Sequence, residues 1–421
     1  MSKKIKVGLI GLTLESHLSG IPGLRERMEG YLNHAAGKLA IPGVKVLRLG
    51  LVDHPEKARR AGDFLSGEQV EAVFVFFASG GEHQSLLPAL VRPRVPVLIL
   101  NLQPAPALNY QLISEMADGD KRKGEMLSFS QVRALARAAV VLNQSDLSYR
   151  IVSGWLEDDQ AWEEITAWEQ VIRARCQLRE TRIGLLGNWE CPDSADADIR
   201  NAVSRFSVQF EYIDKREIAR NRELVKDEEL GKKRTRFTDR DSGDLEETAE
   251  ISCALDRAVA EHKIDLLVGC SSASEVWRKS ILAKVHVPVF WEGGISGALA
   301  CRILELLGSH GQIAALQSVD YLEEVLLWEH GAGVSSHQGE ITCLGFIQDT
   351  GALPEMVVAQ GISQGDEYPG MRIRYELPVR RFITEWAQSG AGDQCVIGTG
   401  YQAVSIMQLC EVLQIPCRKI C

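Results

Sequence analysis

The sequence lacks the motifs of several common enzyme classes. No Gly-x-Gly-x-x-Gly loop completes the pattern that Gly8 and Gly11 begin, and no Walker loop is present. NAD and ATP are therefore not the expected cofactors. A Gly-x-Ser-x-Gly nucleophile elbow is also missing, which argues against the mechanism of the α/β-hydrolases.

Long apolar runs and export signals are missing too. No stretch reaches the roughly 18 apolar residues that a membrane-spanning helix requires. The basic segment 1–8 leads directly into a strand pattern and lacks the cleavage site of a signal peptide. The ten cysteines form no Cys-x-x-Cys pair. We therefore expect reduced, mostly buried thiols in a cytoplasmic protein that does not bind membranes.

The charge balance argues against another class of partner. The 421 residues carry a formal net charge of −10, which is unfavourable for binding nucleic acid or an anionic membrane surface. This length predicts two or three domains. The basic run 232–236 lies in a charged stretch, 214–247, and is flanked by acids. We interpret this run as a solvated, mobile loop rather than a phosphate-binding patch.

Strand and helix patterns alternate through the first two-thirds of the chain in the rhythm of βαβ units. The continuous apolar runs 73–77 and 97–100 are typical of strands that are buried on both faces of a parallel sheet. Residues 181–187 repeat the pattern of residues 5–11, in which an apolar strand reaches a glycine. The chain therefore contains two α/β blocks, and the charged helical pattern 158–178 joins them.

The last third of the chain has shorter strand-like runs separated by Gly and Asp turns, a pattern typical of antiparallel β structure. We predict an α/β protein with two Rossmann-like parallel-sheet domains, residues 1–170 and 171–310. A C-terminal β-rich domain, residues 311–421, follows as an antiparallel, barrel-like unit with a terminal helix.

A single carboxylate, Glu292, stands where an apolar strand runs into a glycine-rich turn, and a helix over about 296–307 follows. A second acid, Asp320, ends another strand-like run 28 residues later. Two carboxylates at strand ends can share a divalent metal and perform acid–base chemistry on a polyol. The alternative interpretation is that Glu292 is a solvated loop acid.

Three short motifs follow one another along the chain. They are Glu292-Gly293-Gly294-Ile295-x-Gly297-Ala298-Leu299, Trp328-Glu329-His330-Gly331, and Glu385-Trp386-Ala387-x-x-Gly390 with Gly398-x-Gly400. In this order and spacing the chain resembles the L-fucose/L-arabinose isomerase family, whose members tend to have Glu-Gly-Asp-Ile and Trp-His-Cys-Gly at the first two places. The resemblance covers most of the chain in the same domain order.

The resemblance implies a metal-dependent aldose–ketose isomerase that acts through an enediolate. Such enzymes bind a divalent ion, usually Mn2+, with two carboxylates and one histidine, and by position the carboxylates are Glu292 and Asp320. Both would also act as acid and base. Gln103 resembles the glutamine that touches substrate in arabinose isomerases. Because family sites are completed by a neighbouring subunit, we expect a homo-oligomer with its active site near a subunit interface.

The chain departs from the family at the metal histidine. The family's His-His pair lies just before the turn at 398–400, where this chain has Gly392-Asp393-Gln394-Cys395. Asp393 can supply an oxygen ligand instead, and His330 or His337 could replace the histidine. Two alternatives therefore stand beside the isomerase: a diverged activity on a sugar-like ligand, and a non-catalytic sugar-binding or regulatory protein of the same fold.

Four further side chains are candidates for substrate binding. His17 follows the first strand and faces the same sheet edge as the other loops. Glu82 and His83 lie in a glycine-containing loop between a buried strand and a helix, although an ordinary βα turn would look the same. Trp291 could stack on the apolar face of a sugar ring or could equally be a core residue.

Overall fold

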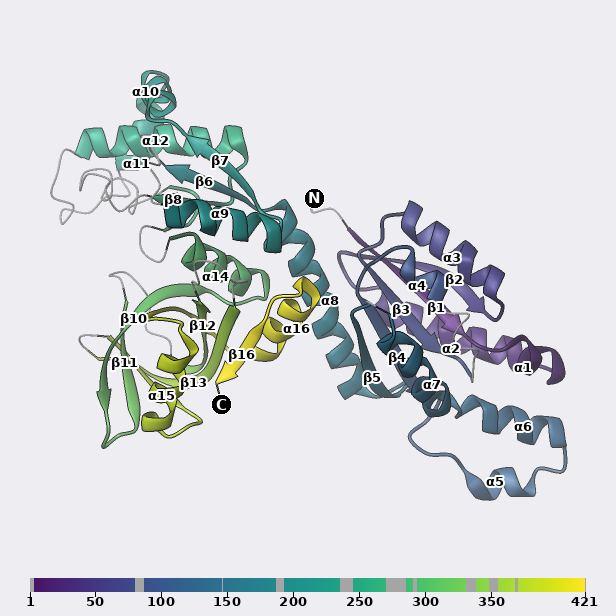
Figure 1. The fold of residues 1–421 in the computed structure, drawn as a ribbon. Coiled ribbons are helices and arrows are strands. Elements are labelled where there is room, and N and C mark those ends of the chain that lie inside the picture. Colours follow the sequence, from purple (N-terminus) through teal and green to yellow (C-terminus); the bar gives the residue numbers. More distant parts are fainter. Residues whose placement is uncertain are drawn as a thin grey trace. The chain divides into compact units, whose positions relative to one another are not determined.

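The structure is a computed structural model. It describes residues 4–79, 87–145, 147–186, 193–234, 245–269, 285–290, 294–330, 338–347, 355–367 and 370–420. The chain divides into two compact units, Met1–Arg173 and Ala174–Cys421. Figure 1 traces the helices and strands of each unit in order.

The first unit is an α/β domain built on a parallel sheet. Its strands lie in the order β2-β1-β3-β4-β5, and every pair is parallel. The strands are β1 (Ile5–Leu12), β2 (Val44–Val52), β3 (Ala72–Phe77), β4 (Val97–Gln103) and β5 (Tyr149–Trp155). The helices are α1 (Glu15–Gly20), α2 (Leu24–Leu39), α3 (Pro55–Gly67), α4 (Leu87–Val91), α5 (Tyr110–Glu115), α6 (Gly119–Ser128), α7 (Gln131–Asn143) and α8 (Asp159–Glu180), which continues into the second unit.

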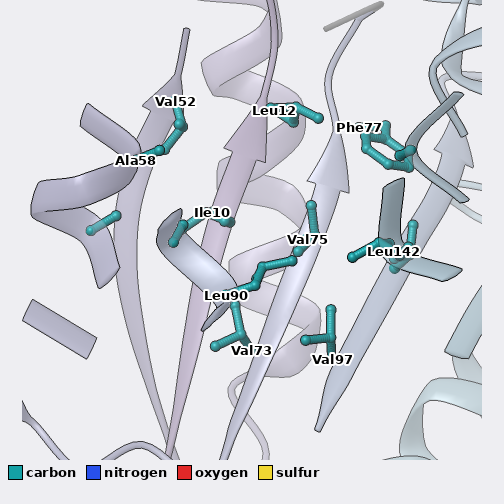
Figure 2. Close-up of a cluster of buried hydrophobic side chains, with 14 of the residues drawn as sticks. Ile10, Leu12, Val52, Ala58, Val73, Val75, Phe77, Leu90, Val97 and Leu142 are labelled. Atoms are coloured by element: carbon teal, nitrogen blue, oxygen red, sulfur yellow. The ribbon is translucent and has the colours of Figure 1, made fainter. Parts of the chain in front are cut away.

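Figure 2 shows part of the core of the first unit, where side chains from α3, α4 and α7 meet one face of the sheet. Ile10, Val75 and Ile99 come from three adjacent strands and are fully buried. All six residues of β3 are buried, as its unbroken apolar sequence predicts. The burial of this central strand on both faces fixes where its carboxyl end emerges.

The second unit begins with another parallel sheet, in the order β7-β6-β8-β9. The strands are β6 (Arg182–Leu186), β7 (Gln209–Ile213), β8 (Leu266–Gly269) and β9 (Val289–Phe290). The helices are α9 (Asp193–Phe206), α10 (Lys215–Glu223), α11 (Asp227–Arg234), α12 (Leu245–His262) and α14 (Gly294–Leu306). Two parallel-sheet α/β domains are therefore present, as the sequence predicts.

An antiparallel barrel completes the second unit. Six strands close in the order β12-β15-β10-β11-β14-β13, because β12 also pairs with β13. They are β10 (Gly311–Asp320), β11 (Val325–His330), β12 (Gln338–Ile347), β13 (Glu355–Glu367), β14 (Gly370–Tyr375) and β15 (Gln394–Thr399). α15 (Val379–Ser389) packs against this sheet, and α16 (Ala403–Leu413) precedes β16 (Cys417–Ile420), which is added to β13 in parallel. The prediction of a barrel-like third domain is confirmed.

The interpretation of the basic run 232–236 as a solvated loop was wrong for residues 232–234, the part of the run that is described. These residues end helix α11 (Asp227–Arg234), and Lys233 is only 5% exposed. The ammonium group of Lys233 lies 2.6 Å from a carboxylate oxygen of Asp256 and 2.9 Å from the hydroxyl of Ser252. A buried lysine needs such partners, and a pattern of alternating charge does not reveal which lysine has them.

Helix α8 covers the segment 158–178 that the charged helical pattern predicts, with bounds two residues or fewer from that range at each end. None of the helices within the described ranges is both long and apolar enough to cross a membrane.

Candidate functional site

Helix α14 links the two parts of the second unit. It contacts β8 and β9 of the parallel sheet, and β10, β12 and β15 of the barrel. Gly294 begins the helix with a φ of +54°, a left-handed backbone that glycine adopts without strain. Most of the following turns are buried, including Ile295, Ala298 and Leu299. The start of α14 is therefore held at a fixed position beside the barrel.

Two glycines let α14 approach the barrel closely. Gly311 on β10 and Gly398 on β15 are partners in the antiparallel ladder. A Cβ atom on Gly311 would lie 2.8 Å from a methyl of Val396 and 3.1 Å from the Cα of Cys301 on α14. A Cβ on Gly398 would lie 2.6 Å from the hydroxyl of Ser309. A side chain at Gly311 would press on the backbone of α14, and one at Gly398 would press on Ser309 and on Leu304 of α14.

A cavity of about 530 Å³ opens between the start of α14 and the end of the barrel. Its lining residues are Gly294, Ser296, Gly297, Ala300, Ile313, Leu344, Gly345, Phe346, Gly390, Ala391, Gly392, Asp393, Gln394, Cys395 and Val396. The polar side chains are a hydroxyl, a carboxylate, an amide and a thiol, and the remainder are apolar or glycine. Pockets of this size and composition suit small polar ligands that also have an apolar face.

Hydrogen bonds fix the turn that forms one wall of the cavity. Helix α15 ends at Gly390, whose φ of +79° reverses the chain. The indole of Trp386 donates to the carbonyl of Gly392 at 2.8 Å, and the amide of Ala391 donates to the hydroxyl of Ser389 at 3.3 Å. This turn therefore presents Asp393 from a rigid support.

Asp393 and Gln394 are exposed at the cavity, and Cys395 beside them is buried. The amide of Leu316 on β10 donates to the backbone carbonyl of Asp393 at 2.7 Å. This bond fixes the backbone of Asp393 to β10, and it does not involve the carboxylate. Burial raises the pKa of the Cys395 thiol well above its usual value. The thiol therefore stays protonated, and Asp393 is the acidic group that the described lining contributes.

The described lining supplies one carboxylate and one amide oxygen as hard donors for a divalent ion. Mn2+ and Mg2+ need more oxygen ligands than these two side chains provide. Within the described ranges, no group of three His, Cys, Asp or Glu side chains is placed to hold a metal ion. A complete metal site here would need a further carboxylate. Glu292, two residues before Gly294 in the chain, lies outside the described residues, as does Trp291.

The structure does not bring Asp320 to this cavity. Asp320 ends β10 in the hairpin to β11, and one of its oxygens accepts hydrogen bonds from the amides of Leu322 at 2.9 Å and Glu323 at 3.0 Å. These bonds, that from Glu323 first, lower the pKa of Asp320. Asp393 is hydrogen-bonded to Leu316 of β10, and Asp320 lies further along the same strand. At the usual rise of a strand, Asp320 is about 13 Å along β10 from Leu316.

Two carboxylates that share an ion must place oxygens within about 2.6 Å of it. In the described arrangement Asp320 holds the hairpin turn, and Arg372 adds an ion pair with Glu323 in the same turn. The side chain of His330 and all of His337 lie outside the described residues.

The first unit has a polar cluster at the carboxyl edge of its own sheet. The hydroxyls of Thr13 and Ser79 are 2.7 Å apart, and Nδ1 of His17 lies 3.2 Å from the Ser79 hydroxyl. Burial, followed by the positive charges of Lys123 and Arg133, lowers the pKa of His17. This edge, between β1 and β3, is where the strand order β2-β1-β3 reverses, and ligands bind at such edges in α/β proteins.

Gln103 ends β4 at the same edge, and its amide donates to the carbonyl of Pro106 at 3.3 Å. Asn101, nearby on β4, is 7% exposed, and its side-chain oxygen has no hydrogen-bond partner. His17 and Gln103 thus belong to the first unit, and Asp393 belongs to the second. Glu82 and His83 lie outside the described residues.

Sequence reasoning missed Ser296 and the turn 390–392 as parts of the cavity, and Thr13 and Asn101 as parts of the sheet edge. Thr13 directly follows β1, so its position at a strand end was a usable signal. Ser296 gave no such signal, because its place at the cavity depends on how α14 packs on the barrel.

No protein-family model matches this chain, and no curated protein matches it. Among solved structures, an ABC transporter periplasmic solute-binding protein from Actinobacillus succinogenes with bound D-allose is similar over 75% of this chain and 94% of its own, at 10% identity. The TM-score of that match is 0.16, which carries no argument about fold or function.

Proposed function

We propose that the cavity at the start of α14 binds a sugar or sugar derivative, and that the protein is a metal-dependent aldose–ketose isomerase. The observation that carries the proposal is that Ser296, Asp393 and Gln394 line one cavity of about 530 Å³, whose other lining residues are mostly apolar or glycine. Hydroxyl, carboxylate and amide groups match the hydroxyls of a sugar, and apolar groups match its C–H faces. The cavity is large enough for a six-carbon sugar.

Asp393 and Glu292 are the carboxylates that we assign to the ion, with Mn2+ or a similar divalent metal as the cofactor. In the sequence Glu292 lies two residues before Gly294, which begins α14 and lines the cavity. When bound, the ion would stabilise the negative charge that develops on an enediolate. In this proposal Asp393 binds a substrate hydroxyl or accepts its proton, and Gln394 orients the substrate.

The second candidate is a sugar-binding or regulatory protein without catalytic activity. It is favoured by one observation: Asp393 is the one carboxylate in the described lining of the cavity. Asp320 is committed to its hairpin by two backbone hydrogen bonds. A cavity with a single acid can bind a polyol, but it binds a divalent ion weakly.

Mn2+ titration of the full chain, purified without chelator, tests the metal assignment. We expect wild-type protein to bind one Mn2+, and Asp393→Asn to weaken binding by about tenfold or more. Asp320→Asn is the matched control, because it alters an exposed acid of the same barrel outside the cavity. Equal effects of the two substitutions would contradict the assignment of Asp393.

A panel of aldoses and ketoses with Mn2+ then tests the reaction. Interconversion by wild-type protein that is lost in Asp393→Asn supports the isomerase. Binding of a sugar in calorimetry without Mn2+ binding or interconversion would sink the isomerase and leave the sugar-binding protein.

We also propose that the protein is a cytoplasmic homo-oligomer. Large apolar side chains are exposed on α5, α6 and α7 of the first unit: Tyr110, Leu112, Met126, Val132 and Val140. Exposed apolar side chains are candidate contacts between subunits where they form a contiguous patch. Sedimentation velocity of the wild-type chain tests this, and a monomer at micromolar concentration would overturn it.

A further inference from the structure

Two cysteine side chains meet beside the last strand of the second unit. Cys410 lies in the final turns of α16, and Cys417 is the first residue of β16. The turn between them is tight, because the amide of Ile415 donates to the carbonyl of Cys410 at 2.8 Å and Gln414 has a φ of +56°. The chain therefore folds back and brings the side chains of Cys410 and Cys417 into contact.

The neighbouring strand fixes the position of this pair. Met356 on β13 is the register partner of Cys417, and its amide donates to the carbonyl of Pro416 at 2.9 Å. The sulfur of Cys410 lies 3.2 Å from the sulfur of Met356. The Cys410 thiol is thus held at Met356, and Cys417 lies beside Met356 in the strand ladder.

The two thiols differ in access. Cys410 is 1% exposed, whereas Cys417 is only partly buried. The hydrogen bond from Cys410 lowers the pKa of Cys417, which increases its thiolate fraction at neutral pH. A partly exposed thiol with a lowered pKa beside a buried second thiol is the arrangement found in reversible redox pairs.

Cys410 and other cysteines of the chain have the opposite character from Cys417. The hydrogen bond with Cys417, followed by burial, raises the pKa of Cys410, so Cys410 is not the attacking sulfur. Burial raises the pKa of Cys301 to about 12 and also raises the pKa of Cys253. Thiols of this kind are poor nucleophiles at neutral pH. Reactivity toward an oxidant is therefore expected at Cys417 in preference to these buried positions.

We propose that Cys410 and Cys417 are a peroxide-sensitive pair that forms a reversible disulfide, with Cys417 as the attacking sulfur and Cys410 as the resolving one. The Cys417 thiolate attacks one oxygen of hydrogen peroxide; an S–O bond forms, the O–O bond breaks, and hydroxide leaves. The Cys410 sulfur then attacks the sulfenic acid; the S–S bond forms, the S–O bond breaks, and the hydroxide released takes the Cys410 proton. The first hydroxide takes up the proton that Cys417 lost on ionising, so the dithiol is oxidised and the peroxide is reduced to two molecules of water. A reducing dithiol reverses the change.

The disulfide would join α16 to β16, and β16 is hydrogen-bonded to β13 over residues 417–420. Oxidation would therefore hold the last strand on the barrel sheet. This role is independent of the cavity, whose described lining contains neither cysteine.

Peptide mapping of the full chain after mild peroxide treatment and thiol blocking tests the pair. Cleavage after Glu385, Glu411 and Arg418 separates Cys410 from Cys417 and removes Cys421. We expect fragment 386–411 to be linked to fragment 412–418, with fragmentation placing the bond at Cys410 rather than Cys395. We also expect iodoacetamide to modify Cys417 about tenfold or more faster than Cys253.

Cys417→Ser and Cys417→Ala should fold like wild type and form no link, and the matched control Cys253→Ser should form it normally. In Cys410→Ser, Cys417 should proceed to sulfinic acid because its resolving partner is missing. A link from Cys417 to Cys421 or to another molecule, or equal alkylation of Cys417 and Cys253 with no link, would overturn the proposal.

Discussion

The indole nitrogen of Trp386 donates a hydrogen bond to the carbonyl of Gly392 across 2.8 Å, one residue before Asp393. The same ring is 2% exposed and packs edge-to-face on Trp328, with ring centroids 5.6 Å apart. A single side chain thus connects the hydrophobic core of the barrel to the wall of the cavity. The position of the proposed ligand group depends on this core contact.

Replacing Trp386 by Phe should loosen the cavity wall. The variant keeps an aromatic ring but leaves the Gly392 carbonyl without its donor, at a cost of about 2 kcal/mol in the stability of the second unit. Mn2+ and sugar binding should weaken as well. Trp162→Phe is the matched control, because the indole of Trp162 donates to the Leu156 carbonyl at 2.8 Å in the first unit. Unchanged ligand binding in Trp386→Phe would show that the turn does not depend on this bond.

Gly392→Ala isolates the effect of the backbone at the same turn. Gly392 has a φ of +75°, and a Cβ atom there would meet no heavy atom within 4 Å. The substitution should therefore cost about 1 kcal/mol from the left-handed conformation alone. Gly231→Ala, in the middle of α11 and also in open space, should instead stabilise by about 0.5–1 kcal/mol. Urea unfolding of both variants checks the contrast, and equal shifts would contradict it.

Glu169 should make the stability of the first unit depend on pH. This carboxyl is 1% exposed, one of its oxygens has no hydrogen-bond partner, and burial raises its pKa to about 8. The unfolded group ionises near pH 4.5, so stability should fall as pH rises from that value to about 8. Each unit of pKa difference corresponds to about 1.4 kcal/mol.

Glu169→Gln keeps the shape and removes the ionisation. We expect it to be more stable than wild type at pH 8 and close to wild type near pH 4.5. Denaturant midpoints across this range provide the measurement. Curves that stay parallel for the two proteins would mean that Glu169 titrates normally in the folded chain.

His17 should remain neutral below its usual titration range, because burial and then Lys123 and Arg133 lower its pKa. An NMR titration of the imidazole should show a midpoint that moves upward in Lys123→Ala. Lys38→Ala, a lysine that does not contribute to the pKa of His17, is the control. A midpoint that is the same in all three proteins would remove the electrostatic explanation.

The sequence predicted the fold correctly where a whole strand is apolar and buried, and where short strands are separated by turn residues. The run at residues 73–77 became the fully buried β3, and the Gly-punctuated runs after residue 311 became the barrel. The prediction of a solvated loop was wrong at Lys233, because the burial of this lysine depends on Asp256 and Ser252 of another helix. Long-range partners leave no trace in the local pattern of charge.

The candidate site was only partly readable for the same reason. Asp393 was singled out and does line the cavity. Asp320 was expected at the same site because it ends a strand-like run, as Glu292 does. In the ladder, however, Gln394 at the start of β15 is opposite Ala315, and β10 continues past that level to Asp320 in the hairpin. Sequence shows that a residue ends a strand, but the register decides which other strand end lies next to it.

The strand β16 covers one edge of β13 and so protects the barrel sheet from pairing with other molecules. It covers residues 356–359 of β13, whose side chains are fully buried, and it comes from much later in the chain. A chain shortened before Cys417 would leave these four residues as an open, apolar strand edge. Such an edge pairs readily with other molecules, so truncation at this point should produce aggregates rather than a slightly less stable protein.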